Sequence, residues 1–332
     1  MKVAILGAGF MGGTHARAFQ KIPGVDIAAV YAHSDKRAGP LAQELGTVYT
    51  NDIDAILRDE SIDAVDNCLP TPEHRPLTEA ALAAGKHVLL EKPIALDDAD
   101  AAALVAAGEA SGQVFMMAHV LRFWPEYVEL HKRASNGSIG QLRSGLAYRR
   151  QPFPAWSELF ARSDLTGGAV IDMMIHDIDA LNWVFGAPQS VTANGVRNPR
   201  SNGWDQVQIL IDYGTVSAVV DGGMMMPETY PFTSTMQVLG SEGFLEYDFR
   251  AGGRSVEEAG GTNALYLYPN EGEPSQLEVT QIDPYLAEIE YFVECVRSGQ
   301  PATRATPAEA RLALDTALAA RESMESSRTV AL

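Results

Sequence analysis

Short apolar runs alternate with amphipathic stretches over the first third of the chain, and this is the pattern of strands that are followed by helices. The runs end in glycine, proline or polar residues, which are typical of turns. Because strand and helix alternate with short connections, the pattern predicts an α/β fold with a parallel, doubly wound sheet up to about residue 120. The predicted strands are Lys2–Leu6, Asp26–Ala32, Ile62–Leu69, Lys86–Leu90 and Val114–Ala118, and the clearest helices are Pro76–Gly85 and Asp97–Ser111.

The pattern changes after Trp124, where strands begin to follow one another directly. A helix at 126–135 precedes a strand at 141–150, and the apolar stretch Ala169–Phe185 is predicted as one helix between two glycine stops. Consecutive strands joined by hairpins predict a predominantly antiparallel open sheet, so the second domain is of the α+β type. We expect domains at 1–121 and 122–332, with the last helices able to pack back on the first domain. The strands are Val191–Val196, Asp205–Asp212, Thr215–Gly222, Ser234–Gly240, Gly243–Phe249 and Ala264–Tyr268, and helices follow at Pro284–Ser298 and Pro307–Ser323.

Composition and charge narrow the class of protein. The 332 residues are enough for two ordinary domains, and 46% hydrophobic with 20% charged residues is typical of a globular protein. The formal net charge of −18 argues against nucleic acid and anionic membranes as partners. No apolar run is long enough to span a bilayer, and Met1 leads directly into a strand, which does not fit a signal peptide. Cys68 and Cys295 are too few for a disulfide framework or a cysteine-based zinc site, and a reducing cytoplasm is the expected location.

A glycine-rich hexapeptide follows the first strand and opens a helix. Its sequence, Gly7-Ala8-Gly9-Phe10-Met11-Gly12, matches G-x-G-x-x-G. In this position Gly7 allows the tight turn, Gly9 lets the backbone approach a pyrophosphate, and Gly12 lets helix and strand pack closely. The free N–H groups at the start of the helix would bind the phosphates. The first domain is therefore predicted to be a Rossmann domain that binds NAD or NADP.

The end of the second strand is where a Rossmann domain reads the adenosine ribose, and an acid there would bind the 2′-hydroxyl of NAD. This chain has Ala32 at the strand end, and the first acid comes only at Asp35. Ser34, Lys36 and Arg37 could instead hold a 2′-phosphate, which favours NADP. The alternative is that Lys36 and Arg37 open the next helix and face water.

Lys92 occupies an unusual position for one of only six lysines, because the turn Glu91-Lys92-Pro93 follows an apolar strand directly. At the carboxyl end of a parallel strand, its ammonium group can point to a bound nicotinamide and to a substrate hydroxyl. The turn Pro70-Thr71-Pro72 lies at the same edge of the predicted sheet, and Thr71 is positioned to cap the helix that follows. The alternative for Lys92 is an ordinary surface lysine just past a strand.

Asp172 and His176 are four residues apart in the predicted helix Ala169–Phe185, so they share one face, and Asp179 lies on that face as well. A carboxylate one turn from an imidazole keeps the ring oriented and raises its proton affinity, which suits a general base. The alternatives are an ion pair on the helix surface, or a cation held by Asp172, His176 and Asp179. The apolar residues around the pair favour a function, since a carboxylate and an imidazole are costly to bury.

These motifs, in this order, resemble the glucose–fructose oxidoreductase, inositol dehydrogenase and rhizopine-catabolism (Gfo/Idh/MocA) family over almost the whole chain. The resemblance implies a nicotinamide-dependent oxidoreductase that acts on sugars, cyclitols or similar polyols. Two positions depart from the family pattern: Ala169 replaces a third glycine found in many members, and Ala32 replaces the acid of NAD-preferring members. The resemblance rests on the glycine motif, Pro70-Thr71-Pro72 with His74, Glu91-Lys92-Pro93, Arg122-Phe123, Gly167-Gly168 with Asp172, His176 and Asp179, and the closing helices.

Carried over by position, the resemblance implies that Lys92, Asp172 and His176 are the catalytic residues. The substrate wall is expected to include Asp172 and His176, together with Arg122, Trp156 and Tyr230. No metal is expected. The expected cofactor contacts are Gly7, Gly9, Phe10, Met11, Gly12, Ser34, Lys36, Arg37, Leu69, Thr71, His74, Glu91, Lys92 and His119.

Three functions remain open from the residues alone. In a dehydrogenase, His176 would take the hydroxyl proton as hydride leaves the carbon, Lys92 would stabilise the developing alkoxide, and Asp172 would fix substrate and imidazole. A sugar sensor or structural protein would bind the cofactor without turnover. A metal-dependent aldolase or hydrolase would lose its activity on chelation. One open face of the antiparallel sheet favours a homodimer or homotetramer through that sheet.

Overall fold

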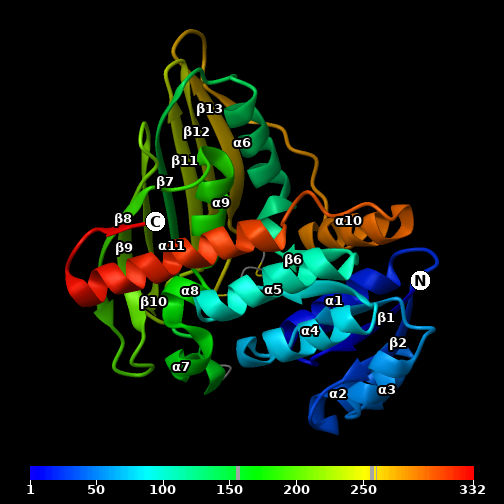
Figure 1. The fold of residues 1–332 in the computed structure, drawn as a ribbon. Helices are drawn as coiled ribbons and strands as arrows, with labels where there is room; N and C mark the ends of the chain where they lie inside the picture. The colour runs from blue at the N-terminus through cyan, green and yellow to red at the C-terminus, as the bar shows by residue number, and fades with distance from the viewer. Residues whose placement is uncertain (155–157, 255–257, 259) are drawn as a thin grey trace. The chain divides into compact units, whose positions relative to one another are not determined.

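The computed structural model describes residues 1–154, 158–254, 258 and 260–332 (Figure 1). They form two compact units: unit 1 consists of Met1–Phe123 and Ile282–Arg311, and unit 2 of Trp124–Gln281 and Leu312–Leu332. Unit 1 therefore takes a segment from the C-terminal part of the chain in addition to the predicted domain 1–121. No helix in the described ranges is both long and apolar enough to cross a membrane.

The sheet of unit 1 has six parallel strands in the order β3-β2-β1-β4-β5-β6. This is the doubly wound order of a dinucleotide-binding domain, in which the strand order reverses next to β1. The predicted parallel sheet is confirmed, although the prediction missed β3 and the helix α3 that follows it. The strands are β1 (Lys2–Leu6), β2 (Asp26–Tyr31), β3 (Val48–Thr50), β4 (Ala64–Asn67), β5 (His87–Glu91) and β6 (Phe115–Ala118).

Helices cover both faces of this sheet, with α1, α2 and α10 on one face and α4 and α5 on the other (Figure 1). The side chains of Phe19 in α1 and Phe292 in α10 meet edge to face, with ring centroids 6.5 Å apart. The late helix α10 is therefore part of the core of unit 1. The helices are α1 (Phe10–Gln20), α2 (Asp35–Leu45), α3 (Ile53–Arg58), α4 (His74–Ala83), α5 (Asp98–Ser111) and α10 (Pro284–Ser298), with 3-10 turns η1 (Thr71–Glu73) and η2 (Val120–Arg122).

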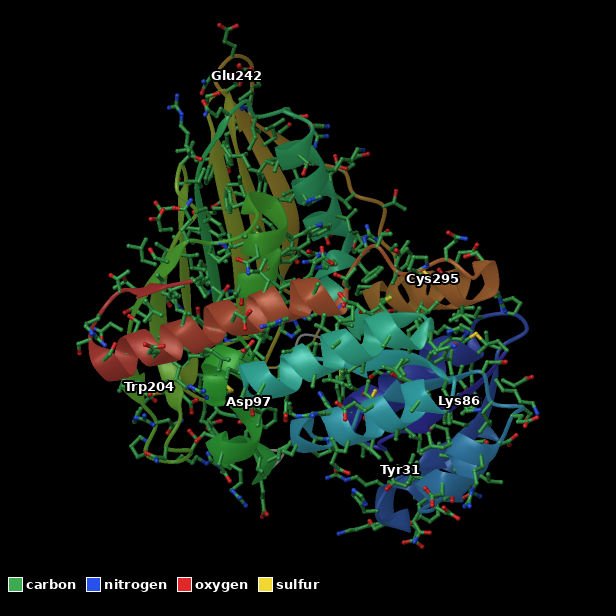
Figure 2. The ribbon with its side chains drawn as sticks, viewed as in Figure 1. Tyr31, Lys86, Asp97, Trp204, Glu242 and Cys295 are labelled. Carbon is green, nitrogen blue, oxygen red and sulfur yellow. The ribbon has the colours of Figure 1, made fainter. Side chains whose placement is uncertain are left out.

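Side-chain caps explain where two of these helices begin. The carboxylate of Asp97 accepts a backbone N–H at the start of α5 (Figure 2), and the carboxylate of Asp283 does the same for α10. The predicted cap at Thr71 is wrong. Thr71 is the first residue of η1 and follows Pro70, so its hydroxyl lies a turn too early for α4, which begins at His74 without a side-chain cap.

The sheet of unit 2 has nine strands in the order β14-β13-β12-β11-β7-β10-β9-β8-β15. All neighbours are antiparallel except β7 and β10, so the predicted, predominantly antiparallel sheet is confirmed. The strands are β7 (Leu142–Pro152), β8 (Ser190–Arg197), β9 (Trp204–Asp212), β10 (Ser217–Met226), β11 (Thr233–Gly240), β12 (Gly243–Arg250), β13 (Thr262–Pro269), β14 (Ser275–Leu277) and β15 (Val330–Ala331).

Helices of unit 2 pack on one face of this sheet, against β7, β9, β10, β12 and β13. On the opposite face, alternate side chains of the strands stay partly or fully exposed, including the large apolar residues Leu210, Leu239 and Tyr268. The sheet therefore has one covered and one open side. The helical segments are α6 (Pro125–Ser135), η3 (Glu158–Ala161), α7 (Ser163–Thr166), α8 (Gly168–Asp172) and α9 (Ile175–Phe185), while α11 (Pro307–Ser326) begins in unit 1 and continues in unit 2.

The stretch Ala169–Phe185, predicted as one helix, is interrupted between α8 and α9. The N–H of Met174 bonds to the carbonyl of Ala169, five residues back, at 2.8 Å, and the N–H of Asp177 bonds to the carbonyl of Met174, three residues back, at 3.0 Å. The regular i to i−4 hydrogen bonds of an α-helix are thus replaced here by one i to i−5 bond and one i to i−3 bond. The prediction of one continuous helix is wrong, because Asp172 ends α8 and His176 belongs to the first turn of α9. That their side chains share one face stays a prediction.

Candidate active site

The glycine motif has the geometry that a bound dinucleotide requires. Gly7 has a φ of +108°, and a Cβ at Gly12 would lie 2.0 Å from the carbonyl oxygen of Gly7, so neither position can carry a side chain. Gly9 differs from both, since a Cβ there would meet no atom of the described residues within 4 Å. The space beside Gly9 therefore lies open where a pyrophosphate would approach the backbone.

The start of α1 supplies hydrogen-bond donors to this space. Gly9 is the N-cap residue and provides no side-chain cap, and Phe10 and Met11 open the first turn. The first bond of the helix runs from the N–H of Gly13 to the carbonyl of Gly9, at 3.1 Å. The N–H groups of the first turn have no partner within the helix, and the helix dipole favours an anion at this end. The residues fit the phosphates of a dinucleotide.

The end of β2 presents cations instead of the acid that would hold a ribose hydroxyl. The residue that follows the strand is Ala32, and Ser34, Lys36 and Arg37 are all exposed at the start of α2. Neither Lys36 nor Arg37 forms an ion pair with any residue in the described part of the chain. His33 lies between them and the strand.

Lys92 follows the last residue of β5 at the carboxyl edge of the sheet. It is partly exposed, whereas Val88–Glu91 and Pro93–Ala95 on either side are buried. Glu91 is only 6% exposed: its Oε2 accepts the N–H of Lys92 at 3.0 Å, and its Oε1 lies 3.3 Å from Nε2 of His15. The carboxylate of Glu91 therefore shapes the turn from inside, and its contact with the cofactor stays a prediction.

His74 joins two loops at this edge. It is 1% exposed, with Nδ1 2.8 Å from the carbonyl oxygen of Pro93 and Nε2 2.9 Å from that of Leu69. The ring thus contacts the main chain of both the loop after β4 and the loop after β5, and it lies between them. His119 is also buried, at the end of β6. Thr71 is partly exposed at the same edge.

Asp172 and His176 stand out by their exposure. Between Gly168 and Asn182 they are the two residues that are partly exposed, and all others in this stretch are buried. The expectation of a buried carboxylate and imidazole is therefore corrected: the chain brings these two polar side chains toward the surface on either side of the helix break. Asp179, by contrast, is 1% exposed.

A cation site at Asp172, His176 and Asp179 is not supported. Among the described residues, the group whose ligand atoms all lie within 4.8 Å of one another consists of His15, Asp66 and Cys68, which belong to unit 1.

The residues predicted at the substrate wall differ in their burial and contacts. Arg122 is 2% exposed and its Nη1 binds Oε1 of Glu309 at 2.6 Å, so the structure uses it to anchor the start of α11. Its assignment to the substrate wall stays a prediction. Tyr230 is partly exposed in the loop before β11, with the guanidinium of Arg250 5.8 Å from its ring centre. Trp156 lies outside the described residues.

Sequence reasoning missed two buried groups of charged residues. Arg149 and Asp177 form an ion pair inside unit 2. His15 lies in unit 1 among three carboxyl groups and a thiol, and is 0% exposed. A signal was available for His15, because it precedes Phe19 by four residues and therefore shares the buried face of α1. Its partners come from distant segments, so no local pattern could identify them.

Comparison with known proteins agrees with this geometry. Residues 1–119 match the model of an oxidoreductase family with an NAD-binding Rossmann fold, and residues 127–246 match the GFO/IDH/MocA C-terminal domain. A dTDP-3,4-didehydro-2,6-dideoxy-alpha-D-glucose 3-reductase of Streptomyces violaceoruber is 31% identical over 86% of this chain and 82% of that protein. A myo-inositol 2-dehydrogenase of Thermotoga maritima is 27% identical over 100% of this chain and 98% of its own length.

A solved structure is similar over the same extent. The crystal structure of GenD2 from gentamicin A biosynthesis, in complex with NAD, has a TM-score of 0.86 and 25% identity, and the match covers 100% of this chain and 96% of that one. Both halves of the chain thus match one family, in the order in which its motifs occur along the sequence. The chain belongs to the GFO/IDH/MocA family of oxidoreductases.

Proposed function

We propose that this protein is an NAD(P)-dependent oxidoreductase that interconverts a secondary hydroxyl and a ketone on a sugar, a cyclitol or a related polyol. The observation that carries the proposal is the position of Lys92, a partly exposed ammonium at the carboxyl edge of a sheet whose glycine loop fits a dinucleotide. Open parallel sheets bind their ligands at this edge. The relatives support the substrate class, since their names describe a dTDP-sugar reductase and an inositol dehydrogenase.

In this proposal unit 1 holds the cofactor and unit 2 supplies the base. The bound cofactor supplies the hydride acceptor. His176 takes the proton from the oxygen of the substrate hydroxyl while the hydride leaves the carbon that bears this hydroxyl, so that a ketone forms. Lys92 donates a hydrogen bond to the substrate oxygen as negative charge develops there, and Asp172 orients the substrate and the imidazole. A general base placed in this way contributes on the order of 10²–10⁴-fold to the rate.

A screen of polyols and sugars with NAD and NADP tests the proposal, with reduced cofactor followed by absorbance. We expect Lys92→Met and His176→Asn each to lower kcat by on the order of 10²–10⁴-fold with the substrate found. Lys132→Met is the matched control, because the side chain of Lys132 is 68% exposed on α6. Near-normal turnover by both variants would contradict the assigned roles. Sugars that change the fluorescence of bound NADPH without any oxidation would favour a sensor.

We infer that NADP is preferred to NAD. The support is the absence of a carboxylate at Ala32, within the described residues, and the exposed cations of Lys36 and Arg37 near the ribose end of the glycine loop. Loss of one charge-assisted hydrogen bond to a phosphate lowers affinity about tenfold or more. We therefore expect Lys36→Ala and Arg37→Ala to lower kcat/KM for NADP by this factor and to leave kcat/KM for NAD unchanged. A wild-type enzyme that prefers NAD would overturn the inference.

We further propose a homodimer or homotetramer that forms through the open side of the nine-stranded sheet. The support is the apolar content of that side, where Leu210, Leu239 and Tyr268 are 48%, 40% and 36% exposed. Light scattering of the purified protein measures the assembly, and Leu210→Glu with Leu239→Glu should dissociate it. The free thiols of Cys68 and Cys295 support a reducing, cytoplasmic location.

A further inference from the structure

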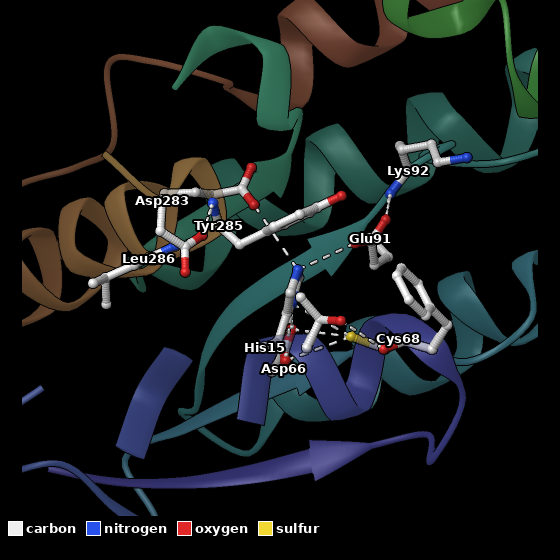
Figure 3. A network of polar contacts seen from close by, with 11 residues as sticks. His15, Asp66, Cys68, Glu91, Lys92, Asp283, Tyr285 and Leu286 are labelled. Atoms are coloured by element: carbon white, nitrogen blue, oxygen red, sulfur yellow. Dashed lines mark hydrogen bonds and ion pairs between the residues drawn. The ribbon is translucent and has the colours of Figure 1, made fainter. Parts of the chain in front are cut away.

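Five titratable side chains meet in the interior of unit 1, next to the Lys92 turn. Figure 3 labels His15, Asp66, Cys68 and Glu91 among them. His15 comes from α1, Asp66 from β4 with Cys68 just after it, Glu91 from the end of β5, and Glu288 from α10. His15, Asp66 and Glu288 are 0% exposed and Glu91 is 6% exposed. Burial of so many ionisable groups without a purpose would be costly. We call these five residues the His15 cluster.

The imidazole of His15 lies between carboxyl groups on both sides. Its Nδ1 is 3.1 Å from both carboxylate oxygens of Asp66, and its Nε2 is 3.3 Å from Oε1 of Glu91 and 3.9 Å from Oε2 of Glu288. A neutral imidazole carries one N–H and would turn its other nitrogen, a lone pair, toward a carboxylate. The geometry therefore fits an imidazolium whose Nδ1 bonds to Asp66 and whose Nε2 faces the carboxylate of Glu91 as an ion pair, without a hydrogen bond from Nε2 among the described residues. Burial lowers the pKa of His15, but the interactions with Asp66 and Cys68 together outweigh this, so that the pKa lies well above its usual 6.5.

One imidazolium among three ionised carboxylates would leave a net charge of −2 in the interior, and a proton kept by one carboxyl group reduces this to −1. Both carboxyl oxygens of Glu288 are buried and without a hydrogen bond among the described residues. Burial raises the pKa of Glu288 well above 4.5, and it raises the pKa of Cys68 well above 9.0, which favours the protonated form of both groups. Burial also acts to raise the pKa of Glu91, but the interactions with His15 and Lys92 together outweigh it and the net shift is downward. Glu91 is therefore the ionised carboxylate of the pair on this side of the ring.

The ionised carboxylate of Glu91 is also the group that holds Lys92. Its Oε2 accepts the main-chain N–H of Lys92 at 3.0 Å, while its Oε1 faces His15 (Figure 3). One carboxylate thus links the imidazole to the first peptide of the turn. His15 itself lies on the helix that begins at the glycine motif, three residues after Gly12. The cluster therefore connects the cofactor loop, the Lys92 turn and α10.

We propose that His15 is a positioning residue: held as an imidazolium between Asp66 and Glu91, it keeps the Glu91 carboxylate in the orientation that fixes the Lys92 turn for hydride transfer. Glu288 stands beside this clamp as a neutral acid. The proposal rests on the proposed function, because it assigns His15 a task in placing the catalytic Lys92. In a metal site, an ion would lie between His15, Asp66 and Cys68. In this proposal, His15 and Asp66 are in direct contact. The N–O distances of 3.1 Å are those of direct hydrogen bonds.

The protonation state of His15 tests the clamp without any assay of activity. The full-length protein, with ¹⁵N in the imidazole rings of its seven histidines, is studied by NMR with NADPH bound. His15 is assigned by the signal that disappears in His15→Gln. We expect both ring nitrogens of His15 to stay protonated from about pH 5 to pH 8, the range across which an ordinary histidine changes its charge. A neutral ring at pH 7, or a stoichiometric metal ion found in the purified protein by mass spectrometry, would overturn the proposal.

Kinetics of two amide variants test the task of the clamp. His15→Gln removes the cation, and a misplaced catalytic group costs about 10²-fold in kcat. We expect this loss in kcat, with the dissociation constant of NADPH unchanged because the glycine loop is intact. Glu288→Gln keeps a neutral group of the same shape, so most of kcat should be retained. A purely structural histidine would instead leave kcat per folded enzyme unchanged in both variants.

The two arms separate failure of this inference from failure of the proposed function. If the wild-type protein oxidises no polyol or sugar, the proposed function fails, while the NMR titration still decides whether the imidazolium exists. If the wild type is active and Glu288→Gln loses as much kcat as His15→Gln, the assignment of the neutral acid is overturned. If His15→Gln keeps normal kcat, the positioning role is overturned, whatever the protonation state.

Discussion

Two buried groups of charged side chains, one in each unit, differ in how well their charges are matched. In unit 2, Arg149 and Asp177 form a bidentate ion pair, with Nε 2.8 Å from Oδ2 and Nη2 3.1 Å from Oδ1. One positive charge meets one negative charge, and the guanidinium also lies over the ring of Phe232, 5.6 Å from its centre. The geometry of this pair satisfies both partners.

The His15 cluster in unit 1 is not matched in this way. One imidazole faces the carboxyl groups of Asp66, Glu91 and Glu288, so full ionisation would leave excess negative charge in the interior. A proton must stay on one carboxyl group, and the state of the cluster then depends on pH. The comparison teaches that a buried ion pair with balanced charges, such as Arg149 and Asp177, serves packing and specificity. A buried cluster with excess carboxyl groups, such as the His15 cluster, also holds protons whose release depends on pH.

The largest expected effect comes from breaking the matched pair. Asp177→Asn leaves the buried guanidinium of Arg149 without its counter-charge, and loss of one partner of a buried pair costs about 3–5 kcal/mol. We expect the free energy of unfolding in urea to fall by this amount. The double variant Arg149→Met with Asp177→Leu leaves no buried charge and should be far more stable than Asp177→Asn. If the single and double variants were equally stable, the loss in Asp177→Asn would not come from the unpaired charge of Arg149.

The pH dependence of stability should distinguish the unmatched cluster. Burial raises the pKa of Glu288 well above 4.5, and burial lowers the pKa of His15 but the interactions with Asp66 and Cys68 together raise it well above 6.5. Each group keeps a proton in the folded protein that the unfolded chain releases, so stability falls as pH rises, by about 1.4 kcal/mol per pH unit for each proton. The loss begins above the usual 4.5 of Glu288 and steepens above the usual 6.5 of His15. Glu91, whose pKa is lowered, acts in the opposite sense and loses its stabilisation below 4.5.

Glu288→Gln separates these two contributions. The amide has no proton to lose, so the decline between 4.5 and 6.5 should disappear, and only the decline that belongs to His15 should remain above 6.5. Urea unfolding midpoints of wild type and variant across this range measure the difference. Parallel curves for the two proteins would mean that Glu288 is ionised in the folded state.

The parts of the fold that the sequence predicted are those in which the physical cause is local. The strands of unit 1 have short apolar runs, and the turn at Gly7, Gly9 and Gly12 needs residues without a Cβ, so both could be identified within a few residues. Lys92 could be located because the strand before it ends in a proline turn. The family motifs added the pairing of Lys92 with Asp172 and His176, which stays a prediction.

The parts that were missed depend on residues far apart in the chain. Asp66 lies 51 residues from His15, and Glu288 belongs to a helix of the C-terminal part. Nothing in the local pattern of α1 says which charges a buried histidine will meet. The break between α8 and α9 was missed for another reason: Met173 and Met174 are apolar like their neighbours, so the hydrophobic period continues through a point where the hydrogen-bond ladder does not.

The ion pair of Arg122 and Glu309 is less buried than the Arg149–Asp177 pair and the His15 cluster, and we expect the smallest change in stability from substitutions next to it. Arg122 is buried, but its partner Glu309 is 34% exposed and also accepts the N–H of Thr306, while the hydroxyl of Thr306 accepts the N–H of Glu309. This reciprocal arrangement is a capping box at the start of α11. Thr306→Ala removes the cap hydrogen bond together with the one that the hydroxyl donates to Oε2 of Glu309, and should cost about 1 kcal/mol in urea unfolding, without the pH dependence expected of the His15 cluster. Thr306→Ser keeps the hydroxyl and should be close to wild type, so a large loss in that variant would mean that the methyl group matters more than the cap.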